Sequence, residues 1–480
     1  MEPNAITKRT KILATIGPAV DSPEKIAALI DAGVNGCRMN FSHGDEEERM
    51  NQFRWIREYS AKVGRHVAII QDLQGPKIRI GQLKDDMRYN ISAGDVIGLT
   101  HNIEHDGGNN LPSQYDISDK CKPGDRIYLF DGKIKTIVQN VEGKTVWTRA
   151  ENTSYVISRK SINLPDMRGS RNDILTEKDL ADIEWGLDKD FDYVALSFVH
   201  HADDIKMLRE LLRSKGVDRP IITKLETKSG ASPENLEDIV KASDGVMVAR
   251  GDLAVEAGAE TVPIIQRKII ALCQKHCKFS IVATQMLASM VDNPEPTRAE
   301  VSDVATAAIE GVDVVMLSDE TAMGKYPIEA VNAMRETILY AQNNMPVSPL
   351  YIREGSDKRR DSIAESAVLL AERTNAAAII VETQSGKMAH NISIHHPKCP
   401  IIAVATTDRI ANQVEMSYNT HSFYGGVGEG YVVAEKLFAD GVFGEAPATV
   451  VMVRHNLDGA PIRTANTIQL YILGDDKQWC

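Results

Sequence analysis

Short apolar runs rich in valine, isoleucine and alanine recur along the chain between amphipathic stretches. Eight such runs lie in its first two thirds: TKILATIG, VNGCRMNFS, HVAIIQDL, FDYVALSF, PIITKLE, GVMVARGD, FSIVATQ and VDVVMLSDE. Continuous apolar runs that alternate with helical patterns are typical of buried parallel strands. The pattern predicts the α/β class and a (β/α)8 TIM barrel.

The spacing of these runs breaks once, because the run that ends near Asp72 lies far from the run that begins near Asp192. Between them the chain changes to short alternating runs with turn signals, such as GDVIGLT and EGKTVWTRA. This pattern is typical of a small β domain. We expect a β-barrel lid domain over residues 79–163, inserted into a barrel formed by residues 1–78 and 164–346.

Five further apolar runs follow the linker SPLYIREGSDKRRD: AAAIIVET, CPIIAVAT, HSFYGG, ATVVMVR and TIQLYIL. They alternate with helical segments, which predicts a smaller C-terminal α/β domain over residues 347–480. Several domains also suit a chain of 480 residues, because single cores stop growing near roughly 250–300 residues.

Charge and composition narrow the classes of function. The net charge of -12 provides no basic field for nucleic acid or for a membrane surface. No apolar run approaches the roughly 20 residues that cross a bilayer, and the first residues lack a signal-peptide core, so we expect a cytoplasmic protein. The six cysteines show no C-x-x-C spacing and indicate neither disulfides nor a zinc site.

Candidate chemistry lies at the carboxyl ends of the predicted strands, where such barrels hold their active sites. Alternation places Lys224 and Glu226 on one face of the fifth strand, and Asp252 follows the sixth. Two carboxylates with substrate oxygens commonly hold Mg²⁺. A buried lysine–glutamate pair also occurs as a purely structural feature, so the pair alone is consistent with both interpretations.

Cations and small polar groups share the same predicted mouth. Arg38, Asn40 and Ser42 lie on one face at the end of the second strand, and a guanidinium suits a phosphate. Gly251 would let a ligand approach the backbone closely. Carboxylates, a lysine and an arginine under a lid favour phosphoryl transfer. The chain contains no P-loop motif that would identify a nucleotide.

Six motifs then indicate a family: RMNFSHG, DLQGPKIR, MVARGDL, ATQML, PTRAEVSDVA and MLSDETAMGKYP. In order and spacing the chain resembles the pyruvate kinases from near Thr10 to its C-terminus. The resemblance implies phosphoryl transfer from phosphoenolpyruvate to ADP, giving pyruvate and ATP, as the last step of glycolysis. It also implies Mg²⁺, for which Mn²⁺ can substitute, and a homotetramer.

The resemblance assigns catalytic and metal-binding roles by motif. Arg38 matches the arginine that holds the substrate phosphate. Lys224 matches the lysine that stabilises the phosphoryl group during transfer. Glu226 and Asp252 match the magnesium ligands.

Further matches concern the substrate carboxylate and the nucleotide. The backbone at Gly251 and Asp252, with Thr284, matches the contacts to the substrate carboxylate. Thr284 also lies near the point where the enolate of pyruvate receives its proton. Arg79 and Lys160 match nucleotide contacts near the lid hinge.

The monovalent cation site departs from the family. Asn40, Ser42, Asp72 and Leu73 match its ligands, although Leu73 replaces a threonine. Lys77 replaces a glutamate that potassium-dependent members carry. A tethered ammonium can supply the positive charge of a bound K⁺. We therefore expect activity that does not depend on potassium.

Three other departures are Ala254 and Asp166 in place of glycine, and Asp319 in place of glycine or alanine. We expect the methyl group of Ala254 to alter affinity by shifting the backbone near the substrate carboxylate, without removing the chemistry.

In the C-terminal domain a polar loop follows a predicted strand and resembles the effector-phosphate loop of the family. Its candidate residues are Thr383, Ser385, Gly386 and Lys387. A sugar phosphate or a nucleotide would suit such a loop, and the alternative is a plain helix cap.

Two other functions remain to be weighed. One is a lyase in which Lys224 forms a Schiff base with a keto acid. The other is a sugar-phosphate sensor that keeps the fold but has lost activity. The family resemblance favours phosphoryl transfer over the lyase, and the retention of every charged residue that the kinase reaction requires favours it over the sensor.

Overall fold

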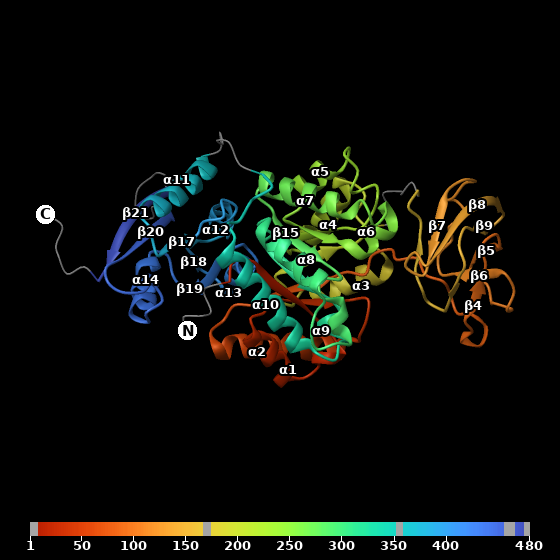
Figure 1. The fold of residues 1–480 in the computed structure, drawn as a ribbon, viewed down its shortest axis with the longest axis horizontal. Helices are drawn as coiled ribbons and strands as arrows, with labels where there is room; N and C mark the ends of the chain where they lie inside the picture. Colours follow the sequence, from red (N-terminus) through yellow and green to blue (C-terminus); the bar gives the residue numbers. More distant parts are fainter. Residues whose placement is uncertain (1–7, 167–173, 352–358, 456–465, 475–480) are drawn as a thin grey trace.

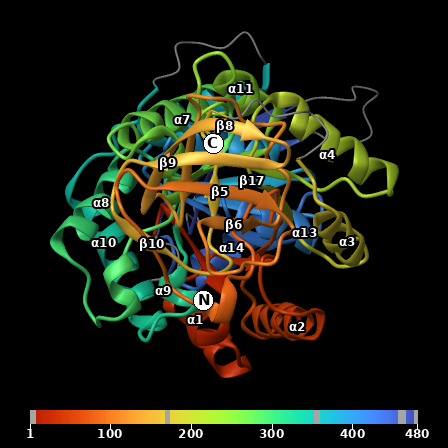
Figure 2. The ribbon, with the colours of Figure 1, turned by 90° about the vertical axis from the view of Figure 1, so that its right-hand side faces the viewer.

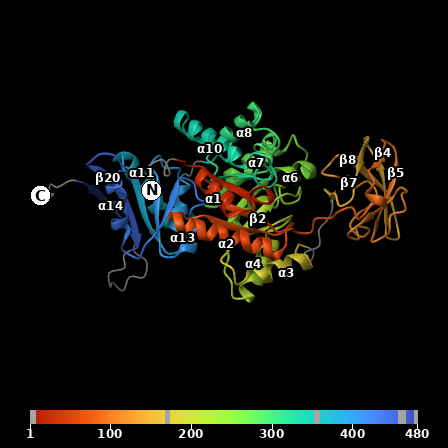
Figure 3. The ribbon, with the colours of Figure 1, turned by 90° about the horizontal axis from the view of Figure 1, so that it is seen from below.

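The computed structural model describes residues 8–166, 174–351, 359–455 and 466–474. Three parts lie in a row along the long axis, with the C-terminal domain at one end, the barrel in the middle and the inserted strands at the other end (Figure 1 and Figure 3). Part of the predicted linker, residues 352–358, lies outside the described residues.

The middle part is a closed barrel of eight parallel strands, as predicted, and each predicted apolar run contains one of them. The strands are β1 (Lys11–Ile16), β2 (Gly36–Asn40), β3 (Ala68–Asp72), β12 (Tyr193–Leu196), β13 (Ile221–Leu225), β14 (Gly245–Ala249), β15 (Phe279–Ala283) and β16 (Val314–Leu317). They are apolar along nearly their whole length because helices cover the outside while side chains fill the interior.

The covering helices are α1 (Pro23–Ala32), α2 (Glu46–Val63), α3 (Glu177–Gly186), α4 (Ala202–Ser214), α5 (Leu236–Ala242), α6 (Arg250–Ala257), α7 (Val262–His276), α8 (Arg298–Ile309), α9 (Asp319–Ala322) and α10 (Pro327–Asn344). Side chains cap several of them, including α1 and α2. Thr176 and Asp179 form a capping box at α3, and Thr297 and Glu300 form one at α8.

The inserted segment contains β4 (Tyr89–Ile91), β5 (Val96–His101), β6 (Asn110–Ser113), β7 (Arg126–Leu129), β8 (Ile134–Glu142), β9 (Thr145–Ala150), β10 (Ser154–Val156) and β11 (Ile162–Asn163). Six of them form one sheet with β11 and β6 at its edges. Isolated bridges join Arg79 to Ser161, beside β11, and Ile80 to Ser113, in β6. The two edges are thereby linked, which gives the segment its barrel-like form. Seen from the lid side, its strands lie in front of the barrel (Figure 2).

The C-terminal domain has a five-stranded sheet in the order β19-β18-β17-β20-β21. Its strands are β17 (Ala378–Thr383), β18 (Ile401–Ala405), β19 (Thr420–Tyr424), β20 (Ala448–His455) and β21 (Asn466–Leu473), and its helices are α11 (Arg359–Arg373), α12 (Lys387–Ser393), α13 (Asp408–Val414) and α14 (Gly430–Ala439). Among the described helices, none has the length and apolarity needed to cross a membrane.

This domain docks against the amino ends of the barrel strands. The buried ammonium of Lys11, at the start of β1, lies 3.5 Å from a carboxylate oxygen of Glu415. The hydroxyl of Tyr193, at the start of β12, donates to the Gln413 carbonyl at 2.9 Å. The carboxyl ends of the strands therefore face the inserted domain, and the candidate residues lie at that open end.

Candidate active site

Lys224 occupies the centre of the mouth, near the end of β13. Its ammonium lies 3.0 Å from an oxygen of Glu226 and 3.4 Å from an oxygen of Asp72, at the end of β3. It also donates a hydrogen bond of 2.7 Å to the hydroxyl of Ser197, beyond β12. Alternation along β13 correctly predicted that Lys224 and Glu226 come together.

The surroundings of Lys224 keep it charged. Burial lowers the pKa of its ammonium, but the charges of Asp72 and Glu226 outweigh burial and raise that pKa above its ordinary value. Burial raises the pKa of Glu226. The charge of Lys224 lowers this pKa in part, and the charge of Asp252 raises it again. A Schiff-base lysine requires a neutral amine, so this environment disfavours the lyase interpretation.

Arg38 is anchored beside the same carboxylate. Its Nε donates to Asp72, and its terminal nitrogen donates to the Thr15 hydroxyl at 3.1 Å. Burial lowers the pKa of His43, and the positive charges of Arg79 and Arg38 lower it further. The two arginines thus contribute to one positive region at the mouth.

Asp252 lies in the first turn of α6, directly beyond β14. Its carboxylate is 3.1 Å from the ammonium of Lys77, and about a quarter of each side chain is exposed. The amide of Gly251 donates to the Thr284 hydroxyl at 2.8 Å. These contacts bring the predicted carboxylate-binding residues together.

Two strand ends adopt unusual backbone conformations. Phe198, beyond β12, and Thr284 and Gln285, beyond β15, have φ angles of 56°, 66° and 55°. Residues other than glycine rarely occupy this left-handed region, and such strain concentrates at functional sites. Arg250 holds one of these turns by donating to the Thr284 carbonyl at 2.8 Å. The sequence contains no local signal for this strain.

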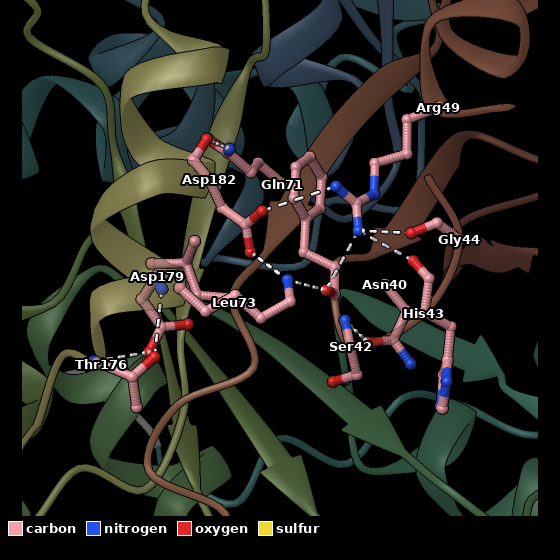
Figure 4. A network of polar contacts seen from close by, with 12 residues as sticks. Asn40, Ser42, His43, Gly44, Arg49, Gln71, Leu73, Thr176, Asp179 and Asp182 are labelled. Carbon is pink, nitrogen blue, oxygen red and sulfur yellow. Dashed lines mark hydrogen bonds and ion pairs between the residues drawn. The ribbon is translucent and has the colours of Figure 1, made fainter. Parts of the chain in front are cut away.

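Side chains of α2 and α3 form a polar network that holds the loop beyond β2 (Figure 4). The ammonium of Lys178, on α3, donates to the Phe41 carbonyl at 2.6 Å and pairs with Asp182 at 2.5 Å. Arg49, on α2, donates to the carbonyls of Phe41, His43 and Gly44. Sequence reasoning missed these residues because Lys178 and Phe41 are 137 positions apart.

The proposed nucleotide residues lie together where the lid leaves the barrel. The Arg79 guanidinium donates to the Arg159 carbonyl at 3.1 Å. The amide of Ile80 donates to the Lys160 carbonyl at 2.7 Å, so the two chain segments run side by side. The Lys160 ammonium lies 5.0 Å from the centre of the Phe130 ring.

The residues of the predicted monovalent site already have partners within the protein. The side-chain oxygen of Asn40 accepts from the Ser42 amide at 3.1 Å, and the Leu73 carbonyl accepts from Ser197 at 2.7 Å. The carboxylate of Asp72 forms ion pairs with Arg38 and Lys224. Among the described residues, the ion pair of Lys77 is with Asp252.

The candidate effector loop lies at the other end of the barrel. Ser385, Gly386 and Lys387 line a cavity of about 600 Å³ between the C-terminal domain and the amino ends of the barrel strands. The Thr383 hydroxyl accepts from the Gly386 amide at 2.9 Å, which closes the turn.

A barrel whose mouth gathers buried cations and carboxylates beneath an inserted domain defines an enzyme that transfers charged groups. Family models specify the kind of enzyme: the pyruvate kinase barrel domain matches residues 7–331, and the pyruvate kinase alpha/beta domain matches residues 361–468. The chain belongs to the pyruvate kinase family. It transfers a phosphoryl group from phosphoenolpyruvate to ADP, giving pyruvate and ATP.

Individual relatives agree with this assignment. A pyruvate kinase from Mycobacterium intracellulare is 38% identical over 87% of this chain and 88% of its own. A pyruvate kinase from Corynebacterium glutamicum is 37% identical over 87% of this chain and 86% of its own length. The crystal structure of a pyruvate kinase from Cryptosporidium parvum matches with a TM-score of 0.87 at 29% identity, over 98% of this chain and 97% of that one. The resemblance that the motifs indicated is confirmed, and the family generally uses Mg²⁺ and K⁺.

Proposed function

We propose that the mouth of the barrel carries out the transfer with the residues that the motifs assign. Arg38 binds the substrate phosphate, and Lys224 stabilises the charge of the phosphoryl group as it moves. Thr284 contacts the substrate carboxylate together with the backbone of Gly251 and Asp252. The carrying observation is the buried cluster around Lys224, whose ammonium lies within 3.4 Å of two carboxylates. Such preorganised charge is the main source of catalysis in phosphoryl transfer.

Glu226 and Asp252 would hold Mg²⁺, and Mn²⁺ can replace it. Carboxylate oxygens suit this hard cation, which binds through one or two carboxylates plus substrate oxygens. Among the described residues of the mouth, the carboxylates of Asp72, Glu226 and Asp252 each pair with a cation, namely Arg38, Lys77 or Lys224. A bound divalent ion would therefore supply the added positive charge that a phosphate ester needs.

Replacing Lys224 tests the assigned role. Lys224→Met should lower kcat by about a thousandfold, because one preorganised charge is lost from the transition state. Lys206→Met, on the exposed surface of α4, is the matched control and should keep full activity. A folded Lys224→Met enzyme with near-normal kcat would remove Lys224 from the mechanism.

We also propose that K⁺ is dispensable. The support is the ammonium of Lys77, which lies 3.1 Å from Asp252 and so brings a fixed positive charge to the mouth. The predicted potassium ligands would then have only a structural role, through the hydrogen bonds and ion pairs described above. These ligands are Asn40, Ser42, Asp72 and Leu73.

A phosphate-bearing effector is proposed for the cavity beside Ser385, Gly386 and Lys387. The opposite side of the loop, behind Thr383, leaves only about 10 Å³. There the carboxylate of Glu382 accepts from the amides of Gly428 and Gly430 at 3.2 and 2.9 Å. Because Glu382 already occupies these amides, the interdomain cavity is the side of the loop that we propose for the effector. If Lys387→Ala does not weaken stabilisation by a sugar phosphate or a nucleotide, the assignment fails.

The remaining proposals concern organisation. We propose the domain boundaries 1–78 with 164–346, 79–163 and 347–480, a cytoplasmic location and a homotetramer without nucleic-acid or membrane partners. Light scattering of the purified protein tests the assembly, since a mass other than four chains would exclude a tetramer.

A further inference from the structure

An ion network crosses the junction between the lid and the barrel. Asp166 accepts from the Nε and the terminal nitrogen of Arg126 at 2.8 and 2.6 Å, and from the Arg126 amide at 3.2 Å. The Lys228 ammonium lies 3.2 Å from the same carboxylate. Arg126 begins β7 of the lid, whereas Lys228 follows β13 of the barrel, two residues beyond Glu226. One carboxylate thus links the two domains.

The lid end of this network leads to the proposed nucleotide contacts. Strand β7 pairs with β11, and beyond their ends the amide of Phe130 donates to the Ser161 carbonyl at 2.9 Å. Lys160 precedes Ser161 and places its ammonium over the Phe130 ring. The orientation of β7 therefore determines where the Lys160 ammonium lies.

A second set of contacts joins the lid to α6, whose first turn contains Gly251 and Asp252. The Asn163 amide nitrogen lies 3.4 Å from the Glu256 carboxyl, in the last turn of that helix. A β-carbon at Gly132 would lie 3.5 Å from Val255, so the lid backbone comes close to the same turn. The lid is thus fixed against both elements that carry the proposed magnesium ligands.

We propose that Asp166 is a positioning residue for ADP: its bridge between Arg126 and Lys228 fixes the lid so that Lys160 and Arg79 face the mouth. This inference rests on the proposed nucleotide contacts. The bidentate geometry supports it, because a guanidinium fork that meets both carboxylate oxygens fixes orientation more firmly than a single contact. Asp166 is a quarter exposed, whereas Arg126 and Lys228 are 38% and 49% exposed, so solvent partly screens the network and its geometry matters more than its strength.

Steady-state kinetics of Asp166→Asn tests the proposal. The KM for ADP should rise by about tenfold, because small misplacements of a binding group are costly. The KM for phosphoenolpyruvate should change less than about twofold, since its proposed contacts all lie on the barrel. Asp166→Glu, which keeps the charge, should recover part of the loss. Lys144→Met breaks an exposed ion pair within the lid and is the matched control.

A double-mutant cycle separates bridging from local stability. Asp166→Asn and Lys228→Met should each raise the KM for ADP. The double variant should have the same KM for ADP as Asp166→Asn, because both changes break the same bridge. Lys160→Met, measured in parallel, tests the nucleotide contact itself. If Lys160→Met raises the KM for ADP and Asp166→Asn does not, the bridge has no positioning role and only this inference fails. If neither variant changes it, the nucleotide contact is wrong and the inference falls with it.

Discussion

At the scale of single residues, the mouth is a balance of buried charges in which each group depends on its neighbours. The side chain of Asp72 is fully buried and contacts both Arg38 and Lys224. Buried ions persist only when partners compensate their lost hydration. Lys77 adds one positive charge to this cluster through its ion pair with Asp252. Because the charged groups depend on one another, that added charge affects the whole mouth.

Potassium dependence follows from that charge. If Lys77 replaces the ion, turnover should be nearly the same in K⁺ and in tetramethylammonium. Lys77→Glu should make turnover depend on potassium, because it removes the fixed cation and adds a carboxylate. Initial rates in the two salts at constant ionic strength provide the measurement. A large loss of turnover for the wild type in tetramethylammonium would refute the proposal.

At the same scale, the sequence predicted contacts along one strand better than contacts between strands. The meeting of Lys224 with Glu226 followed from alternation along β13. The partner Ser197 was missed, although it follows the neighbouring apolar run, because the strand pattern does not fix which side chains of two adjacent strands come within hydrogen-bonding distance. The left-handed conformation of Thr284 was likewise invisible to residue preferences.

At the scale of elements, the strands were predictable and their supports were not. Buried strands form long apolar runs, whereas the α2 and α3 contacts that hold the loop beyond β2 depend on residues far apart in the chain. Arg49 is the centre of that support: it is nine-tenths buried, donates to three carbonyls and lies 3.5 Å from Asp182.

Arg49→Met should therefore destabilise the barrel and disturb the substrate site. We expect the free energy of unfolding to fall by about 2–4 kcal/mol, because several buried carbonyls and a carboxylate lose their donor. The KM for phosphoenolpyruvate should also rise, since the loop beyond β2 adjoins Arg38. Arg54→Met, on the exposed side of the same helix, is the control for both measurements. Equal stability of the two variants would show that the network does not hold the loop.

At the scale of the whole molecule, the C-terminal domain covers the amino end of the barrel, and partly buried histidines lie at the contact. Burial lowers the pKa of His390 and of His396 to about 4 each. The His396 ring packs on Tyr418 and lies 2.9 Å from the Gly311 carbonyl. Both side chains are therefore neutral in the folded enzyme at neutral pH.

This interface should weaken in acid. Unfolded histidine takes up a proton near pH 6.5 but folded His396 only near pH 4, so its contribution is present above pH 6.5 and lost as the pH falls toward 4. The difference corresponds to about 3 kcal/mol. His396→Gln should flatten the dependence of the unfolding free energy on pH across this window, and exposed His201→Gln should not. Identical slopes for the wild type and His396→Gln would exclude this role.

The central claim is the reaction itself, and a coupled assay tests it most directly. Purified protein with phosphoenolpyruvate, ADP and Mg²⁺ is predicted to form pyruvate and ATP in equal amounts, and chelation of Mg²⁺ should stop the reaction. A folded protein that forms no pyruvate under these conditions would contradict the account.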